Sequence, residues 1–118
     1  MKDFSLPKEV RLRKRAEFLT LSKQGKTVYS QYFLAIVCDR SNQYNRIGIT
    51  VSKKVGNAVA RNRIKRLIRE YFRHRKHSIP GARDINIIAR KGLTTLSNMQ
   101  IIEQLDKLFT KIALADRK

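Results

Sequence analysis

Residues 46–72 read RIGITVSKKVGNAVARNRIKRLIREYF, and most of the expected fold follows from this stretch. Residues 46–52 alternate branched apolar side chains with small ones, which is typical of a β-strand. The small side chains would let another element approach one face of that strand closely. From Ala58 onward, apolar residues recur at the spacing of an α-helix, which we expect to end near His77. Asn57 precedes the helix and is a good N-cap residue.

The segment before this stretch predicts a second strand and a hairpin. Residues 29–38, YSQYFLAIVC, are rich in aromatic and branched side chains, and both alternating faces are apolar. We therefore expect a strand that is covered on both faces. Residues 39–45, DRSNQYN, are typical of a turn, so this strand is expected to form a hairpin with residues 46–52. The pattern also allows an extra short strand near Thr27.

Three further elements are expected on either side. A short helix is predicted over residues 15–23, because Gly25 stands where a left-handed C-terminal cap would lie. Residues 84–90, DINIIAR, predict another short strand. Residues 97–100, SNMQ, have the pattern of a capping box at the start of a last helix. The apolar face of that helix would consist of Ile101, Leu105, Leu108 and Ile112.

The composition indicates one domain, residues 1–118, in which residues 1–14 are expected to be irregular. Hydrophobic residues make up 42% of the 118 residues, which is enough for a small core. Lys and Arg number 27 against 9 Asp and Glu, so the formal net charge is +18. A domain with this charge folds against its own repulsion. The usual reason to retain such a charge is a polyanionic partner.

Several classes of protein are excluded by the same composition. The single cysteine, Cys38, excludes an internal disulfide framework and a multi-cysteine zinc site, and we expect it to be a small buried hydrophobe. No stretch approaches the ~18 uninterrupted apolar residues of a membrane span. The N-terminus lacks the apolar run of a signal peptide. We therefore expect a cytoplasmic protein.

The predicted helix from Ala58 carries an unusually basic surface. Glu70 is the only acid within residues 53–76. A solvated helix face usually mixes charges, because oppositely charged pairs one turn apart stabilise it. This helix repels itself along its length, which favours contact with a polyanion, and arginine is suited to bidentate binding of phosphate. The side chains opposite the apolar stripe are Asn62, Arg66, Arg69 and Arg73.

Residues 50–69, TVSKKVGNAVARNRIKRLIR, resemble the signature of the protein subunit of bacterial ribonuclease P. The resemblance extends over nearly the whole chain. The matching motifs are Ser52-Lys53-Lys54, Gly56-Asn57-Ala58, Arg61-Asn62-Arg63 and Lys65-Arg66-Leu67-Ile68-Arg69. Further agreement lies at residues 11–18, Gly25, Gly48 and Ala89-Arg90-Lys91.

The resemblance implies an α+β fold, a two-layer α/β sandwich with the order α-β-β-(β)-α-β-α. It also implies an unusual left-handed βαβ crossover, formed by residues 46–52, the basic helix and the strand near Ile87. General rules of chain topology predict a right-handed crossover instead.

The function that the resemblance implies is removal of the 5′ leader from precursor tRNA. The holoenzyme would be an endoribonuclease in which the RNA subunit carries the active site and its Mg²⁺. The protein would have no catalytic residue of its own, and no metal or cofactor is assigned to it. Its partners would be the catalytic RNA and precursor tRNA, with no membrane and no obligate protein partner.

Two sets of binding residues follow from the resemblance. The leader would lie in a cleft between the first helix and the sheet, with Phe18 and Phe33 as stacking platforms and Lys53 and Arg90 as phosphate partners. Stacking suits leaders because they vary in sequence; the alternative for both phenylalanines is the core. The catalytic RNA would contact Lys53, Lys54, Arg61, Asn62, Arg63, Lys65, Arg66, Arg69 and Arg73. Two residues, Gly56 and Asn57, would have structural roles.

Three other functions compete with this one. A structural ribosomal protein would have similar size and charge, but it would not need the arrangement in residues 53–66. A helix-turn-helix protein needs a helix and a tight turn before its recognition helix, whereas a strand precedes Asn57. An autonomous nuclease needs clustered carboxylates, and the acids here are scattered. His74 and His77 could chelate a metal, but on a basic surface helix we expect them to be solvated.

Overall fold

The computed structural model describes residues 11–12, 15–39, 45–75 and 83–115. Irregular structure was expected for residues 1–14, a turn at residues 39–45 and a helix end near His77, and these positions lie mostly or wholly outside those ranges. The elements in chain order are α1 (Arg15–Gln24), β1 (Lys26–Tyr29), β2 (Phe33–Asp39), β3 (Arg46–Thr50), α2 (Ala58–Arg75), β4 (Arg83–Ala89), the short 3₁₀ helix η2 (Leu93–Thr95) and α3 (Asn98–Ala115).

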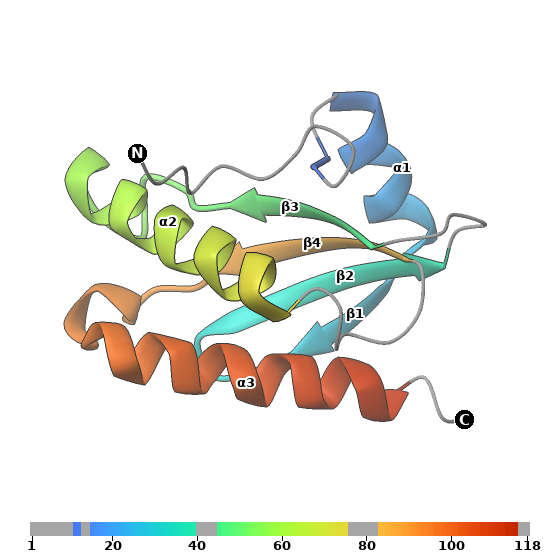
Figure 1. Ribbon diagram of the computed structural model, residues 1–118. Coiled ribbons are helices and arrows are strands. Elements are labelled where there is room, and N and C mark those ends of the chain that lie inside the picture. The colour runs from blue at the N-terminus through green and yellow to red at the C-terminus, as the bar shows by residue number, and fades with distance from the viewer. Residues whose placement is uncertain (1–10, 13–14, 40–44, 76–82, 116–118) are drawn as a thin grey trace.

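The sheet has the strand order β1-β2-β4-β3, so the expected hairpin between β2 and β3 is wrong (Figure 1). Strand β4 lies between them, antiparallel to β2 and parallel to β3. The physical reason is burial: six of the seven β4 residues are buried, so this strand takes a central position. The position of β4 could not be derived from the turn-rich residues that connect β2 to β3.

The hairpin that does form joins β1 to β2, which confirms the extra strand near Thr27. The expected continuous strand over residues 29–38 is therefore broken. The Ser30 N–H donates to the Phe33 carbonyl at 2.8 Å, and Tyr29 pairs opposite Leu34. This turn shifts Tyr29 out of the alternation that residues 33–38 follow.

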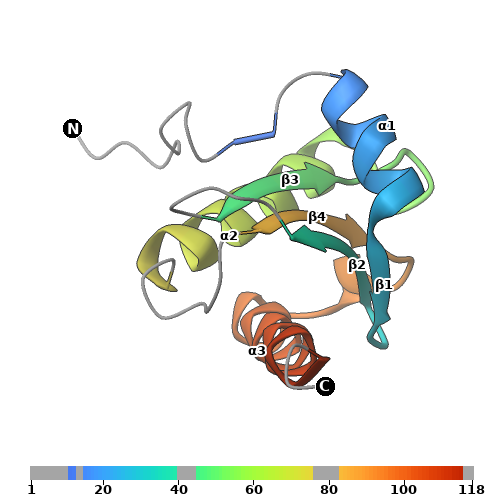
Figure 2. The same cartoon turned by 90° about the vertical axis from the view of Figure 1, so that its right-hand side faces the viewer.

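The crossover from β3 through α2 to β4 is left-handed (Figure 1). In Figure 2, α2 and α3 lie on one face of the sheet and α1 on the other. With this strand order, a right-handed crossover would put α2 on the face that α1 covers. The left-handed connection instead puts α2 beside α3, so both helices bury their apolar stripes in one core.

The helices follow their sequence signals closely. The capping box at the start of α3 is confirmed: the Ser97 N–H donates to Gln100 Oε1 at 2.8 Å, and the Gln100 N–H donates to Ser97 Oγ at 3.2 Å. Helix α1 ends at Gln24, as expected, but Gly25 does not have a positive φ. It is small for another reason, since a Cβ there would lie 2.6 Å from Ile36 Cγ2.

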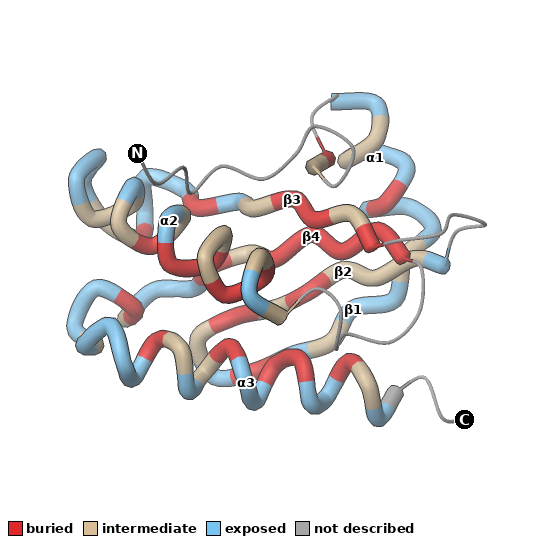
Figure 3. The backbone as a smooth tube through the Cα atoms, in the orientation of Figure 1, coloured by how far each residue is buried: buried red, intermediate tan, exposed pale blue. Residues whose placement is uncertain are grey.

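The core lies between the sheet and the two helices α2 and α3, and we call this side of the sheet the helix-covered face (Figure 3). Its strand residues alternate with those of the opposite side, as β-structure requires. The fully buried members from the sheet are Phe33, Ala35, Ile47, Ile85 and Ile87. The apolar stripe expected on α3, Ile101, Leu105, Leu108 and Ile112, is buried as well.

Candidate nucleic-acid interface

Helix α2 begins at a cap that the sequence predicted. The Asn57 side-chain Oδ1 accepts the Ala60 N–H at 2.9 Å, which satisfies one of the free N–H groups of the first turn. Gly56 is required by close packing, because a Cβ there would lie 2.9 Å from the Thr94 methyl group. These contacts support the structural roles expected for Gly56 and Asn57.

The outer side of α2 brings most of the predicted RNA-binding residues together. Its inner stripe is buried against the sheet and α3 and consists of Ile64, Leu67, Ile68, Tyr71 and Phe72. Asn62 and Arg66 are exposed, and the other basic residues around them are partly exposed. We call Arg61, Asn62, Lys65, Arg66, Arg69 and Arg73 the basic face. Such a surface can neutralise several phosphates at once.

Arg63 differs from these residues, because it contacts the protein itself. Its Nε donates to Asn98 Oδ1 at 2.9 Å, and its Nη2 donates to the Leu96 carbonyl at 2.7 Å. The side chain therefore ties α2 to the start of α3. The sequence placed Arg63 among RNA contacts, whereas the structure engages two of its donor nitrogens in this internal link.

The other end of α2 is also joined to α3. The Tyr71 hydroxyl donates to Asp106 Oδ1 at 2.6 Å, and the Arg75 guanidinium lies 4.2 Å from the Tyr71 ring centroid. Burial and the bond to Asp106 raise the pKa of Tyr71 well above its ordinary range. These contacts orient the whole helix, and with it the basic face.

The second candidate surface is the side of the sheet away from α2 and α3. We call it the open face; its residues are Leu34, Ile36, Gly48, Thr50, Asn86 and Ile88, which are in register across β2, β4 and β3. Leu34, Ile36 and Ile88 are only partly buried, and Thr50 is exposed. Apolar side chains that remain accessible in this way can pack against the flat surface of a base.

Phe18 lies over this face, as predicted. A Cβ on Gly48 would be 2.5 Å from Phe18 Cε1, so the ring rests directly on the glycine. This confirms that the small residues of β3 allow another element to approach closely. Phe18 is half-buried.

Phe33 does not lie in the cleft, and its assignment as a stacking platform is wrong. Its side chain is 0% exposed and belongs to the core on the helix-covered face. Leu34, the next residue, occupies the open face instead. The alternating pattern identified two faces of the strand but did not indicate which one the helices cover.

Tyr29 is an aromatic residue that the sequence pattern did not single out. It is 63% exposed and pairs opposite Leu34, and directly opposed residues share a face of a sheet. Tyr29 therefore stands at the β1 side of the open face. The turn between β1 and β2 hid this position, because alternation read through residues 29–38 puts Tyr29 with Phe33.

The predicted phosphate partners lie at one edge of the sheet. Lys53 and Arg90 follow β3 and β4, and these strands are parallel, so both residues come after carboxyl ends at the same edge. Lys53 and Lys54 are exposed in the turn before α2. Arg90 is exposed too, although its Nη1 donates to the Ser30 carbonyl at 3.0 Å.

An ion-pair network fastens α1 to the sheet. Arg46 on β3 donates from Nε and Nη2 to the two carboxylate oxygens of Asp84, each at 2.9 Å. Its Nη1 donates to Glu17 Oε2 of α1 at 2.7 Å. Burial raises the pKa of the Asp84 carboxyl, and the hydrogen bonds and charge of Arg46 oppose that rise.

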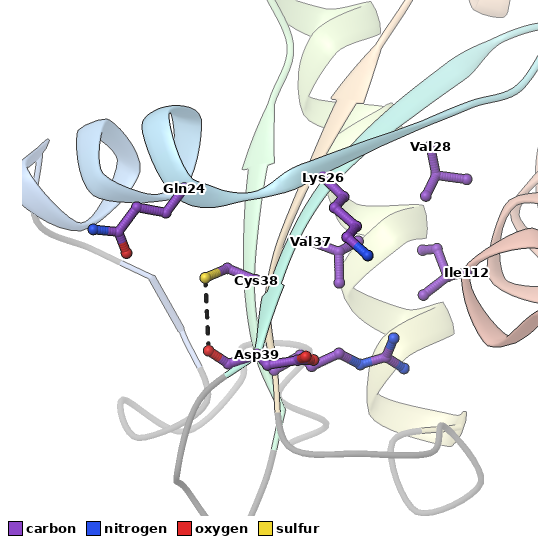
Figure 4. A pocket seen from close by; sticks show the side chains of 8 residues that line it. Gln24, Lys26, Val28, Val37, Cys38, Asp39 and Ile112 are labelled. Atoms are coloured by element: carbon purple, nitrogen blue, oxygen red, sulfur yellow. Dashed lines mark hydrogen bonds between the residues drawn. The ribbon is translucent and has the colours of Figure 1, made fainter. Parts of the chain in front are cut away.

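A pocket of about 270 Å³ lies apart from both surfaces, at the end of the sheet where β2 finishes (Figure 4). Its lining residues are Gln24, Lys26, Val28, Val37, Cys38, Asp39, Arg83 and Ile112. Cys38 is partly exposed, which corrects the expectation of a buried residue, and its Sγ lies 3.6 Å from the Asp39 carbonyl. None of the predicted binding residues lines this pocket.

Within the described ranges, no group of three or more His, Cys, Asp or Glu side chains could hold a metal ion. His74 is exposed on α2, while His77 lies outside those ranges. Among the same residues, no helix has the length and apolar character needed to span a membrane.

Comparisons with known proteins agree with this architecture. The family model for ribonuclease P matches residues 6–113. The ribonuclease P protein component of Desulforapulum autotrophicum is 51% identical over 98% of this chain and 99% of its own length. A Staphylococcus aureus RNase P protein mutant with defective mRNA degradation activity has a TM-score of 0.82 at 39% identity, covering 87% of each chain. The Thermotoga maritima RNase P protein has a TM-score of 0.77 at 38% identity, over 84% of this chain and 94% of that one. The chain therefore belongs to the ribonuclease P protein family, as a protein component of this endoribonuclease.

Proposed function

We propose that this protein binds two RNAs at once, the catalytic RNA of ribonuclease P and the 5′ leader of precursor tRNA. The observation that carries the proposal is the presence of two different surfaces. The basic face of α2 is suited to the phosphates of a structured RNA. The open face, with Phe18 above it, is suited to stacking with the bases of a single strand.

The two surfaces lie on opposite sides of the sheet (Figure 2). Lys53 and Arg90 follow the carboxyl ends of the parallel strands β3 and β4, at the edge where these two sides meet. In the proposal, positive charge at this edge holds leader phosphates as the strand passes from the active site of the RNA onto the open face. Lys54 and the basic face hold the catalytic RNA. The protein thereby increases the affinity of the holoenzyme for precursor over mature tRNA, because only the precursor has a leader.

Cleavage itself is assigned to the RNA subunit and its Mg²⁺, and no residue of this chain has a catalytic role in the proposal. Two acids close to the open face, Glu17 and Asp84, are both bonded to Arg46. Their engagement supports a binding role for this region of the protein.

Reconstitution with the catalytic RNA tests the proposal. The holoenzyme is expected to remove the leader at low Mg²⁺ faster than the RNA alone, and rigorously RNA-free protein is expected to cleave nothing. An mRNA fragment serves as a second substrate, because the S. aureus relative is an RNase P protein mutant with defective mRNA degradation activity. Cleavage of either substrate by RNA-free protein would contradict the assignment of catalysis to the RNA. Equal affinity of the holoenzyme for precursor and mature tRNA would contradict the leader site.

A further inference from the structure

Arg46 occupies an unusual position, because its one guanidinium group joins three elements. It binds Asp84 on the neighbouring strand through two parallel hydrogen bonds and Glu17 on α1 through a third. The Arg46 side chain is only 16% exposed and that of Glu17 only 26% exposed. Ion pairs that are partly withdrawn from water in this way are screened less by solvent than pairs on the surface.

Both ends of this network lie next to the contact between Phe18 and the sheet. Glu17 immediately precedes Phe18 in α1, and Gly48 follows Arg46 by two residues on the same face of β3. The Phe18 ring rests on Gly48. A movement of the first turn of α1 would therefore shift the Phe18 ring across Gly48 or lift it off that residue.

Apart from Glu17 and Phe18, the first six residues of α1 are exposed. The C-terminal part is held by Leu21, which is 2% exposed and whose carbonyl accepts the Gly25 N–H at 2.8 Å. In the first half of the helix, Ala16 is exposed, and Leu19 is 51% exposed. Just before the helix, Leu12 is 6% exposed and its N–H donates to the Ile47 carbonyl at 2.9 Å. The ion pair from Glu17 to Arg46 is a second tie between the start of α1 and the sheet.

We propose that Arg46, acting through Glu17, is a positioning residue for the leader site: it holds the Phe18 ring on Gly48 in the orientation that receives a base. This inference rests on the proposed function of Phe18. It assigns no contact with RNA to Arg46 itself, because the guanidinium is already engaged with two carboxylates.

A direct test follows the Phe18 position without any RNA. The chain contains no tryptophan, so Phe18→Trp provides a single fluorescent reporter at the site. In that background, Glu17→Gln and Arg46→Lys should each increase quenching of the tryptophan by acrylamide. Arg46→Lys retains the charge but loses the planar fork that binds a carboxylate through two bonds. Unchanged quenching in both variants would overturn the positioning role of Arg46, whether or not the leader binds at Phe18.

The functional test is a double-mutant cycle in the reconstituted holoenzyme. Glu17→Gln should weaken precursor binding by roughly three- to ten-fold, on the scale of one ion pair, and leave mature tRNA binding unchanged. In the Phe18→Ala background, the same substitution should cause no further loss, because the group that it positions is absent. Additive losses, or equal losses for both tRNAs, would overturn the inference.

The matched control is Glu103→Gln, which removes the same charge from an exposed position on α3. Loss of an acid by itself should strengthen RNA binding slightly, which is opposite to the effect expected at Glu17. Failure of the proposed function would be recognised separately, since Phe18→Ala alone would then leave the preference for precursor intact.

Discussion

The two faces of the sheet differ in how completely they are covered. On the helix-covered face, α2 and α3 seal the strands, and Ile85 and Ile87 are 0% exposed. On the open face, α1 covers one end (Figure 2), and Leu34 and Ile88 remain partly accessible. Within β2 both alternating faces are apolar, so the side-chain pattern of that strand alone does not separate a core from a binding surface. The difference arises from which face the helices cover.

Two phenylalanines illustrate this difference. Phe33 is enclosed by the core, whereas Phe18 lies half-buried on the open face. The family resemblance made both of them candidate platforms. Substitutions that affect stability, RNA assembly and leader binding separately test the difference between the two faces.

The largest effect is expected from Phe33→Ala. Truncation of a fully buried phenylalanine typically costs about 3–5 kcal/mol of unfolding free energy, because it leaves a cavity. Denaturant unfolding of the free protein measures this loss. Any fall in RNA affinity should be equal for precursor and mature tRNA. Normal stability with a selective loss of precursor binding would return Phe33 to the leader site.

The next largest effect is expected on the basic face, which lies on the outer side of α2. Neutralising Arg66 and Arg69 together, each to Gln, should weaken assembly with the catalytic RNA. The slope of log affinity against log salt should become shallower by about 0.7–0.9 for each phosphate contact that is lost. Lys107→Gln, at an exposed position on α3, is the control. An unchanged slope would show that the two arginines only keep the helix soluble.

Phe18→Ala should affect the open face alone. A stacked base is typically worth ~1–3 kcal/mol, so affinity of the holoenzyme for precursor should fall about ten-fold. Binding of mature tRNA should hardly change. Leu19→Ala, the exposed neighbour on the same helix, is the control and should have little effect on either RNA. Equal losses for both RNAs at reduced stability would place Phe18 in the core.

The smallest effect is expected at the start of α2. Asn57→Ala removes the side-chain oxygen that accepts the Ala60 N–H and should cost about 1 kcal/mol of stability. Asn57→Ser retains a capping oxygen and should recover most of this loss. Thermal or denaturant unfolding measures both variants. Normal stability of the alanine variant with lost RNA assembly would make Asn57 a contact residue.

Much of the helical structure and of the basic surface could be predicted from the sequence. The cap at Asn57, the capping box at residues 97–100 and the apolar stripe of α3 all depend on residues within a few turns of each other. Interactions of this range depend on the spacing of residues along the chain, which can be read from one sequence. The net charge and the motif at residues 50–69 likewise indicate an RNA partner without reference to the packing of the chain.

Only the tertiary structure decided where the strands lie and which aromatic residues are accessible. Strand β4 entered between β2 and β3, the turn after β1 moved Tyr29 to the open face, and Arg46 bound Asp84 from 38 residues away. These outcomes depend on how segments far apart in the chain bury one another. A strand has the same alternating pattern of side chains whichever strand it pairs with, so the pattern does not reveal its neighbour. The sequence therefore predicts α2 and α3 with their N-terminal caps and the basic charge, whereas the packing of the sheet decides which side chains the open face presents.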